Sequence, residues 1–174
     1  MENAKTLFAD PDKCTGCQRC VYVCAAVKEG LFAPSLARLR INNFPLRGYS
    51  VPSICFQCPR PECLEACPAK AIVKNETGVV LVEKEKCDGC GECVAACPYG
   101  LIELDQAGQA YKCDLCRDDP ACVKECRFSA LVFAEPDQEL RRLKGRQMKQ
   151  RQEGGPAENK RRRLALNLLA EARP

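Results

Sequence analysis

Apolar residues in this chain fall into short runs that turn residues and cysteines interrupt. Two of these runs, at residues 72–73 and 79–82, lie on either side of the sequence KNETG, whose Asn and Gly favour a turn. They therefore predict a strand–turn–strand unit. The sequence YGLIELDQAGQAYKC, at residues 99–113, has the same pattern and predicts a second unit. We expect the apolar residues of both units to form the core.

The segment at residues 25–54 differs from the rest of the body because it contains no cysteine. Its apolar residues predict one strand, at residues 36–41, and the Pro, Gly and Asn residues around that strand favour turns. We interpret the segment as a surface insert. It either forms a docking face for a partner subunit or packs over the cysteine-rich parts of the chain.

The character of the sequence changes again near its C-terminal end. Residues 138–152 are polar and predict a helix with a weak apolar stripe, Leu140 and Leu143. Pro156 suits the first turn of a further helix. The apolar residues that would share one face of that helix are Leu164, Ala165, Leu168, Leu169 and Ala172.

Four consecutive basic residues, at 160–163, lie in the N-terminal half of this last helix, where the helix dipole disfavours cations. An acidic surface on a partner would offset that effect, so we predict that the C-terminal helix docks on a partner subunit. A flexible, solvated tail and a membrane-surface helix are alternatives, although the small apolar face lacks aromatic anchors. Nucleic acid is disfavoured as a ligand, because no aromatic residues alternate with the basic ones.

Composition shows that side chains alone would make a thin core. Sixteen of the 174 residues are cysteine, whereas aromatic residues are few: six Phe, four Tyr and no Trp. Something else must therefore organise the interior. Cysteines can do this through disulfides, through zinc or through iron–sulfur clusters.

The sixteen cysteines form four quartets with none left over. In the sequence CDGCGECVAACP, at residues 87–98, three cysteines are spaced three residues apart, and a fourth follows four residues later. Such a run can wrap three thiolates around a [4Fe–4S] cubane, and Gly16, Gly89 and Gly91 allow the tight turns required. The fourth cysteine is better placed to reach a neighbouring cluster. The quartets are Cys14, Cys17, Cys20, Cys24; Cys55, Cys58, Cys63, Cys67; Cys87, Cys90, Cys93, Cys97; and Cys113, Cys116, Cys122, Cys126.

The alternatives to iron–sulfur clusters fit less well. Disulfides require an oxidising compartment, but the N-terminal sequence MENAKTLFADPDKC has neither a signal-peptide stretch nor a twin-arginine pair. No apolar run approaches membrane-spanning length, so we expect a cytoplasmic location, where clustered cysteines bind metal. Cys₄ zinc sites usually combine two separated pairs. The absence of histidine excludes mixed Cys/His zinc sites, Rieske centres and haem attachment.

The formal net charge of +4 conceals an uneven distribution. From Glu135 onward there are eleven Lys or Arg and six Asp or Glu, so this part carries +5 and the remainder carries −1. An oxidised [4Fe–4S] cluster with four thiolates adds about −2. Four clusters would therefore make the body acidic and leave a basic tail.

Over residues 5–134 the arrangement resembles the four-cluster, ferredoxin-like electron-transfer subunits of multi-subunit oxidoreductases. Its most specific features are two widened quartets, CFQCPRPECLEACPAKAI and CDLCRDDPACVKEC, in which Pro61 and Pro120 stand two residues before a cysteine. Similar subunits accompany dimethyl sulfoxide reductase, formate dehydrogenase, carbon monoxide dehydrogenase and tungsten aldehyde oxidoreductase. The segment AAVKEGLFAPSLARLRI and the basic tail look most like the subunits of the tungsten enzymes.

The resemblance implies an α+β fold of two interleaved dicluster ferredoxin-like modules, made of short strands, short helices and cluster loops, plus a C-terminal helical tail. The implied divisions are a four-cluster domain at 1–134, with an inner unit at 55–104, an outer unit from 5–24 plus 105–134 and the insert at 25–54, and a basic helical tail at 135–174.

The resemblance also implies that the first quartet pairs with the fourth and the second with the third. Two positions depart from the usual pattern, because Cys24 and Cys126 are not followed by proline. No ligand is missing, so four [4Fe–4S] clusters are expected. The implied ligands are Cys14, Cys17, Cys20 and Cys126 for cluster 1; Cys24, Cys113, Cys116 and Cys122 for cluster 2; Cys55, Cys58, Cys63 and Cys97 for cluster 3; and Cys67, Cys87, Cys90 and Cys93 for cluster 4.

We therefore expect an electron conductor in anaerobic metabolism, with no substrate chemistry of its own. The sequence has no histidine base, no nucleotide-binding glycine motif and no incomplete quartet that would leave an iron open to substrate. Electrons would pass between a catalytic subunit, a tungsten or molybdenum oxidoreductase, and a flavoprotein or soluble ferredoxin. The alternatives are a partner of carbon monoxide dehydrogenase, formate dehydrogenase or hydrogenase, a free polyferredoxin, a catalytic iron–sulfur enzyme, and a redox-sensing or nucleic-acid-binding protein.

Overall fold

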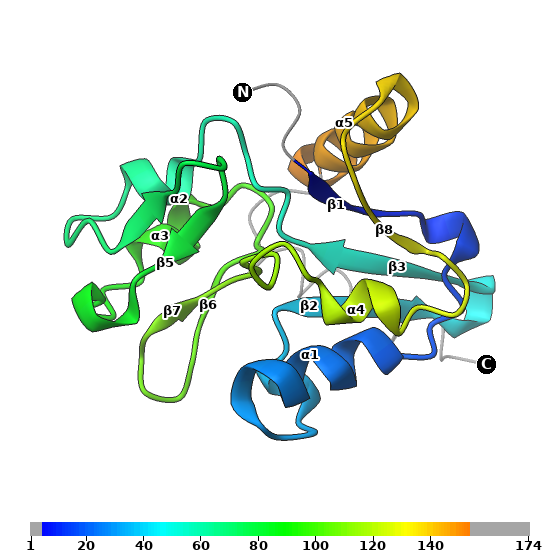
Figure 1. Cartoon of the computed structure of the whole chain (residues 1–174), viewed down its shortest axis with the longest axis horizontal. Coiled ribbons are helices and arrows are strands. Elements are labelled where there is room, and N and C mark those ends of the chain that lie inside the picture. Colours follow the sequence, from blue (N-terminus) through cyan, green and yellow to red (C-terminus); the bar gives the residue numbers. More distant parts are fainter. Residues whose placement is uncertain (1–4, 154–174) are drawn as a thin grey trace.

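The computed structural model describes residues 5–153, which form two lobes (Figure 1). The inner lobe, on the left in Figure 1, comes from the middle of the chain, and the outer lobe combines its beginning and its end. The inner lobe contains α2 (Glu62–Glu65), β4 (Ile72–Lys74), β5 (Val80–Val82), a 3₁₀ helix (Lys84–Lys86), α3 (Glu92–Ala96), β6 (Glu103–Leu104) and β7 (Ala110–Tyr111). The outer lobe contains β1 (Thr6–Ala9), α1 (Arg19–Glu29), β2 (Leu39–Phe44), β3 (Tyr49–Ile54), α4 (Ala121–Lys124), β8 (Leu131–Ala134) and 3₁₀ helices at Pro11–Lys13, Pro34–Leu36 and Pro45–Arg47; α5 (Gln138–Glu153) follows.

The strands of residues 5–153 pair two by two, in four antiparallel ladders. Both predicted strand–turn–strand units are confirmed, as the β4–β5 and β6–β7 hairpins. In each turn a side-chain oxygen accepts a hydrogen bond from a backbone N–H four residues later. Asn75 Oδ1 accepts from Val79 N at 2.8 Å, and Asp105 Oδ1 accepts from Gln109 N at 2.9 Å. The expected α+β fold of short helices and short strands is confirmed.

One ladder joins residues that are far apart in the sequence. β1 pairs with β8, so that Thr6 lies opposite Ala134. Asp10 N extends the contact by donating to Ala130 O at 2.8 Å. The beginning and the end of the cysteine-rich region therefore lie in the same lobe, while the exact domain divisions stay a prediction.

The cysteine-free segment differs from its prediction in two respects. A 3₁₀ turn beginning at Pro34 occupies part of the expected strand, because proline fixes φ in the range that such a turn needs. β2 instead runs from Leu39 to Phe44, whose ring stacks on Tyr49 of β3 at 4.7 Å between centroids. The base of this hairpin is buried at Leu39 and Ile54. The hairpin is thus part of the core at its base, and its tip is a surface feature.

The core divides into two clusters of buried side chains, and cysteines belong to both. The inner cluster is small, with few aliphatic residues around one buried thiol. Cores this thin contribute little burial energy for chains of this length. Buried members of the outer cluster include Leu7, Val21, Leu39, Leu115, Leu131, Cys20, Cys24, Cys113 and Cys122; those of the inner cluster are Ile72, Val80, Cys93, Ile102 and Ala110.

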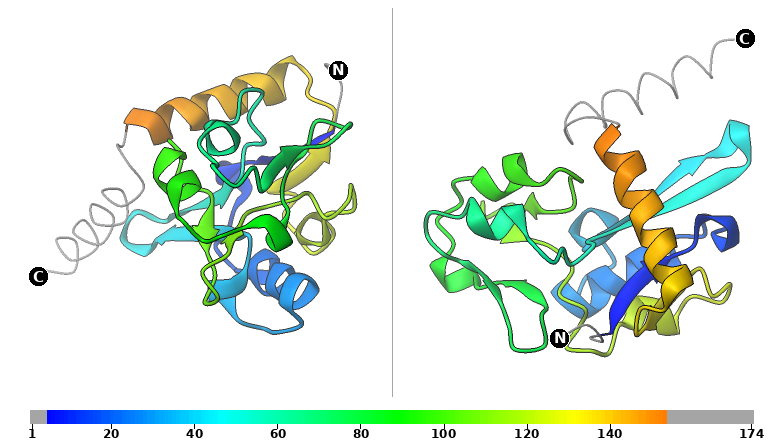
Figure 2. Two further views of the ribbon diagram at one scale, coloured as in Figure 1. Left: turned by 90° about the vertical axis from the view of Figure 1, so that its left-hand side faces the viewer. Right: turned by 90° about the horizontal axis from the view of Figure 1, so that it is seen from above.

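The predicted helix at residues 138–152 is confirmed as α5, which crosses β1 (Figure 2). Gln147 Nε2 donates to Ala9 O at 2.5 Å, and Gln152 Nε2 lies 3.3 Å from the hydroxyl of Tyr99 in the inner lobe. α5 therefore contacts both lobes. The further helix predicted from Pro156, and its docking role, lie outside the described residues. Within residues 5–153 no helix combines the length and the apolar character needed to cross a membrane.

Candidate metal centres

Each quartet follows a common local plan: two thiols lie on a loop, the third is on the second residue of a helix, and the fourth lies within that helix or just beyond its end. In the third quartet the loop turns through Gly89 and Gly91, which have φ of +77° and +81°. Asp88 Oδ1 fixes the loop by accepting from Cys90 N at 3.2 Å. Residues with a Cβ rarely adopt this left-handed backbone, which is why glycine is expected at these positions. The prediction of tight turns at Gly89 and Gly91 is therefore confirmed.

Gly89→Ala should destabilise the protein more than the same change at another left-handed glycine. A Cβ at Gly89 would lie 2.6 Å from the backbone oxygen of Gly108, whereas at Gly30, with φ of +68°, nothing lies within 4 Å. Gly30→Ala should therefore lose only the left-handed penalty of about 1–2 kcal/mol, and Gly89→Ala should lose that amount plus the clash. Anaerobic thermal unfolding measures both. Equal shifts in melting temperature would contradict this expectation.

The fourth quartet contains a left-handed run that the sequence did not indicate. Residues 115–118 have φ values of 58°, 51°, 54° and 64°, although none is glycine. Such backbone costs about 1–2 kcal/mol per residue. It persists only where the surroundings fix it, and here Leu115 is 1% exposed and Asp114 Oδ1 accepts from Cys116 N at 3.1 Å. The feature of the sequence that could have indicated this left-handed run is the widened spacing of the quartet.

The fold gathers the sixteen thiols into four groups of four, in which the members act on one another electrostatically. Each group combines three cysteines of one quartet with the fourth cysteine of another. The grouping coincides with the four implied ligand sets, while ligation itself stays a prediction. Group 1 is Cys14, Cys17, Cys20 and Cys126; group 2 is Cys24, Cys113, Cys116 and Cys122; group 3 is Cys55, Cys58, Cys63 and Cys97; and group 4 is Cys67, Cys87, Cys90 and Cys93.

Two of the groups line hollows whose remaining walls are mostly apolar. The four thiols of group 1 share a hollow of about 350 Å³, its open mouth included, with Ile41, Pro52 and Leu131. The thiols of group 3 share one of about 320 Å³ with neighbours that include Phe56 and Tyr99. Those two rings pack edge to face at 5.0 Å between centroids. Each hollow thus places four sulfur atoms around a space whose other walls are mostly apolar.

Burial makes these thiols difficult to ionise when no metal is bound. Together with neighbouring thiols it raises the pKa of Cys20 to about 12 and that of Cys93 to about 11. Burial also raises the pKa of Cys113 to about 12 and raises that of Cys122. A metal that binds here must therefore displace protons, and its positive charge supplies the compensation that the apolar surroundings lack.

The donor set fits a [4Fe–4S] cubane. Such a cluster takes one thiolate on each of four irons, and backbone N–H groups commonly donate to the sulfurs. Among the described residues no three His, Cys, Asp or Glu side chains are arranged to hold a single ion, and a cubane does not require such convergence. Backbone N–H groups already point at sulfur: the donors are Arg38 to Cys24 at 3.2 Å, Ala71 to Cys67 at 3.3 Å, Leu101 to Cys97 at 3.4 Å and Ala110 to Cys87 at 3.3 Å.

The four groups follow one another through the molecule. Cys122 of group 2 interacts electrostatically with Cys20 of group 1, and Cys113 of group 2 interacts in the same way with Cys55 of group 3. Groups 3 and 4 are joined by α2, which has Cys63 within it and Cys67 just beyond its end. The order is therefore group 1, group 2, group 3, group 4.

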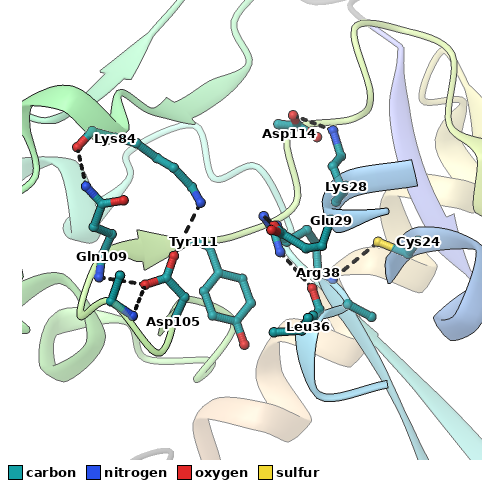
Figure 3. A network of polar contacts seen from close by, with 12 residues as sticks. Cys24, Lys28, Glu29, Leu36, Arg38, Lys84, Asp105, Gln109, Tyr111 and Asp114 are labelled. Carbon is teal, nitrogen blue, oxygen red and sulfur yellow. Dashed lines mark hydrogen bonds and ion pairs between the residues drawn. The ribbon is translucent and has the colours of Figure 1, made fainter. Parts of the chain in front are cut away.

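Charged side chains surround group 2 in compensated pairs (Figure 3). Lys28 Nζ lies 2.7 Å from Asp114 Oδ2, and Arg38 forms an ion pair with Glu29. Burial alone would raise the pKa of Asp114, but the hydrogen bond and charge of Lys28, together with hydrogen bonds from backbone N–H groups such as that of Cys116, outweigh burial and lower the pKa. Lys28 and Arg38 also act on the Cys24 thiol.

Two further lysines lie beside the thiols of group 3. Lys112 is 6% exposed and lines the same hollow as the four sulfurs. Lys144 of α5 is half-buried, and burial lowers its pKa although the Cys58 and Cys55 thiolates act in the opposite direction. The sequence analysis missed both residues. For Lys112 the signal was its position next to Cys113; for Lys144 there was none, because the docking of α5 is a long-range contact.

Comparisons with known proteins agree with this geometry. The family described as "4Fe-4S dicluster domain" matches residues 46–136, and that described as "4Fe-4S binding domain" matches residues 11–27. The aliphatic sulfonate oxidoreductase, polyferredoxin-like subunit of Pyrococcus furiosus is 43% identical over 123 residues, which cover 69% of this chain and 70% of that protein. The thiosulfate reductase electron transfer subunit of Salmonella typhi is 34% identical, and the match covers 88% of each chain.

A solved structure, the active site complex BamBC of benzoyl coenzyme A reductase with benzoyl-CoA, contains a chain 29% identical to this one, with a TM-score of 0.46 over 76% of this chain and 80% of that chain. The two matched domain families and the sixteen cysteines fit four [4Fe–4S] clusters. The chain therefore belongs to the family of 4Fe-4S dicluster, ferredoxin-like proteins that serve as electron-transfer, rather than catalytic, subunits of reductase complexes.

Proposed function

We propose that this chain carries four [4Fe–4S] clusters, held by groups 1 to 4, as an electron wire between a catalytic subunit and a second redox partner in the cytoplasm. The observation that supports this most is the serial order of the groups together with the exposure of their thiols. Cys17 in group 1 and Cys90 in group 4 are exposed, whereas the other fourteen cysteines are buried or half-buried. Both ends of the series are therefore accessible to partners, while the thiols of the two middle groups are all buried or half-buried.

When bound, each cluster would accept and return one electron, with its charge spread over several irons and sulfides. The residues of this chain hold the clusters in place and exclude water. Ile41 and Leu131 do so at group 1, and Phe56 and Ile102 at group 3. Enclosure of this kind limits solvent rearrangement during electron transfer, and N–H donors such as Arg38 N stabilise negative charge on sulfur.

We further propose that the catalytic partner is a tungsten or molybdenum oxidoreductase of the aldehyde oxidoreductase type. The sequence of the cysteine-free segment supports this partner, and the name of the Pyrococcus relative, an aliphatic sulfonate oxidoreductase subunit, supports an oxidoreductase partner more generally. The β2–β3 hairpin of this segment contacts the group 1 loop, because Asn43 and Ser50 pack against Gly16. Its tip exposes Leu46 and Tyr49. The hairpin therefore offers a docking surface beside group 1, and a flavoprotein or soluble ferredoxin would meet group 4.

Native mass spectrometry and metal analysis of the anaerobically purified complex test this function. We expect a stoichiometric catalytic subunit that contains tungsten or molybdenum, and about sixteen iron and sixteen acid-labile sulfide per copy of this chain. Iron far below sixteen, or zinc in its place, would reject the clusters. A fully loaded chain that purifies alone would instead identify a free polyferredoxin.

A further inference from the structure

The charges around the four thiol groups are not distributed evenly. Apart from the neighbouring thiols, the charged side chains that act on Cys58 of group 3 are both lysines, Lys144 and Lys112, and Lys112 is the strongest charged side chain acting on Cys63. At group 4, Asp88 acts on Cys90 with the opposite sign. Group 3 is therefore next to positive charge, and its neighbour in the series is next to negative charge.

The contacts of Lys112 indicate that its positive charge interacts with a negatively charged group in the hollow. Its ammonium donates to two backbone carbonyls, Val80 O at 2.5 Å and Cys113 O at 3.0 Å. An ammonium has three donors, so a third remains for a sulfur atom of the group that fills the hollow. Carbonyl oxygens carry no full charge, and a buried cation is costly unless a negative charge compensates it.

Lys144 approaches group 3 from a different element. Its Nζ lies 5.9 Å from the centroid of the Phe8 ring, and it lines a small cavity together with Phe8, Ile54 and Phe56. Phe56 directly follows Cys55 in the sequence and also lines the group 3 hollow. Apolar neighbours on several sides keep the local dielectric low, so the attraction between this charge and a cluster is screened less than at the surface.

The cations near group 2 do not have the same effect, because each is compensated. Lys28 is paired with Asp114 and Arg38 with Glu29. Lys112 also acts on Cys113 of group 2, but there Asp114 acts in the opposite direction. The two lysines therefore distinguish group 3 from its neighbour on this side as well.

We propose that Lys112 and Lys144 make the cluster held by group 3 the strongest electron acceptor of the four. This inference rests on the proposed function, because it requires clusters in the four groups. Reduction moves one electron from a neighbouring cluster to this one and takes its charge, thiolates included, from about −2 to about −3. A nearby positive charge stabilises the more negative form and so raises the reduction potential. An electron entering the wire would therefore reside mainly on the cluster of group 3, the third of the series.

A spectroscopic redox titration of the whole chain, with all four clusters loaded, tests this proposal. In Lys112→Met and in Lys144→Met, the most positive of the four one-electron waves should move to lower potential. We expect about a tenfold change in the ratio of reduced to oxidised cluster at fixed potential, equivalent to about 59 mV for a one-electron couple. Lys112→Arg, which keeps the charge, should restore the wave, and Cys58→Ser should alter the same wave and so identify it as group 3.

Lys149→Met is the matched control, because Lys149 is an exposed lysine on the same helix as Lys144; all four waves should stay in place. If Lys112→Met lost its iron, Lys144→Met would decide alone. Four unmoved waves, or a shift in a wave other than the most positive one, would overturn the proposal and leave the proposed function intact. Fewer than four waves in the unaltered chain would instead count against the proposed function.

Discussion

Removal of iron from this chain under reducing conditions should abolish its native fold. Five cysteines, Cys20, Cys24, Cys93, Cys113 and Cys122, belong to the buried cores, and the aliphatic residues around them are few. When metal is bound only by the folded state, its binding free energy becomes folding free energy, about 10–16 kcal/mol for a structural zinc site. The net stability of a whole domain is about 5–15 kcal/mol. Loss of four centres should therefore exceed what the side chains alone can supply.

Far-UV circular dichroism and hydrogen exchange after anaerobic chelation measure this effect. We expect loss of the native spectrum and of the cooperative thermal transition. The left-handed run at residues 115–118 should be among the first segments to lose protection, because its strain has no other compensation of that size. The control is addition of iron and sulfide to the stripped chain, which should restore both signals. A metal-free chain that kept its native spectrum and a cooperative melt would show that the side chains suffice.

Cys126→Ser should remove a cluster from a part of the chain more than a hundred residues away. Cys126 lies beside Cys14, Cys17 and Cys20, not beside its own quartet. A serine oxygen is a poorer ligand for iron than a thiolate. We expect about four fewer iron atoms per chain and faster amide exchange at residues 14–20, while residues 113–116 stay protected.

Cys122→Ser is the matched comparison, because Cys122 lies only four positions earlier, within α4, whereas Cys126 lies just beyond the end of α4. Cys122 belongs to the group of Cys24, Cys113 and Cys116, so exchange should increase at residues 113–116 and spare residues 14–20. Mass-spectrometric hydrogen exchange on both variants separates the two patterns. If both variants lost protection only in their own quartet, the crossed arrangement would be wrong.

Much of the local structure could be predicted because its causes are local. The hairpins followed from short apolar runs around KNETG and DQAG, and the left-handed turns from Gly16, Gly89 and Gly91. The spacing of the cysteines indicated the cluster loops and the short helices between the third and fourth thiols. The strand at residues 36–41 was misplaced because the turn propensity of Pro34 outweighed the apolar pattern.

The parts that could not be predicted depend on contacts between distant residues. Nothing in the sequence of α5 indicated that it would lie across β1, because its apolar stripe is weak and several of its contacts are made by polar residues, Gln147, Lys144 and Gln152. In the sequence Lys112 resembles any lysine that follows a short strand, and only the fold shows that it is buried. Residues of this kind set the electrostatics of the candidate site, so the sequence indicated the ligands more clearly than the potentials.

The pairing of β1 with β8 has a consequence for the way this protein is made. During synthesis the ribosome releases β1 first, but its partner emerges about 130 residues later. The inner lobe has all of its own cysteines by residue 97 and can mature while translation continues. The outer lobe must wait with open thiols until residue 134 has left the exit tunnel, so its first cysteines are exposed to oxidants and stray metals for the longest time.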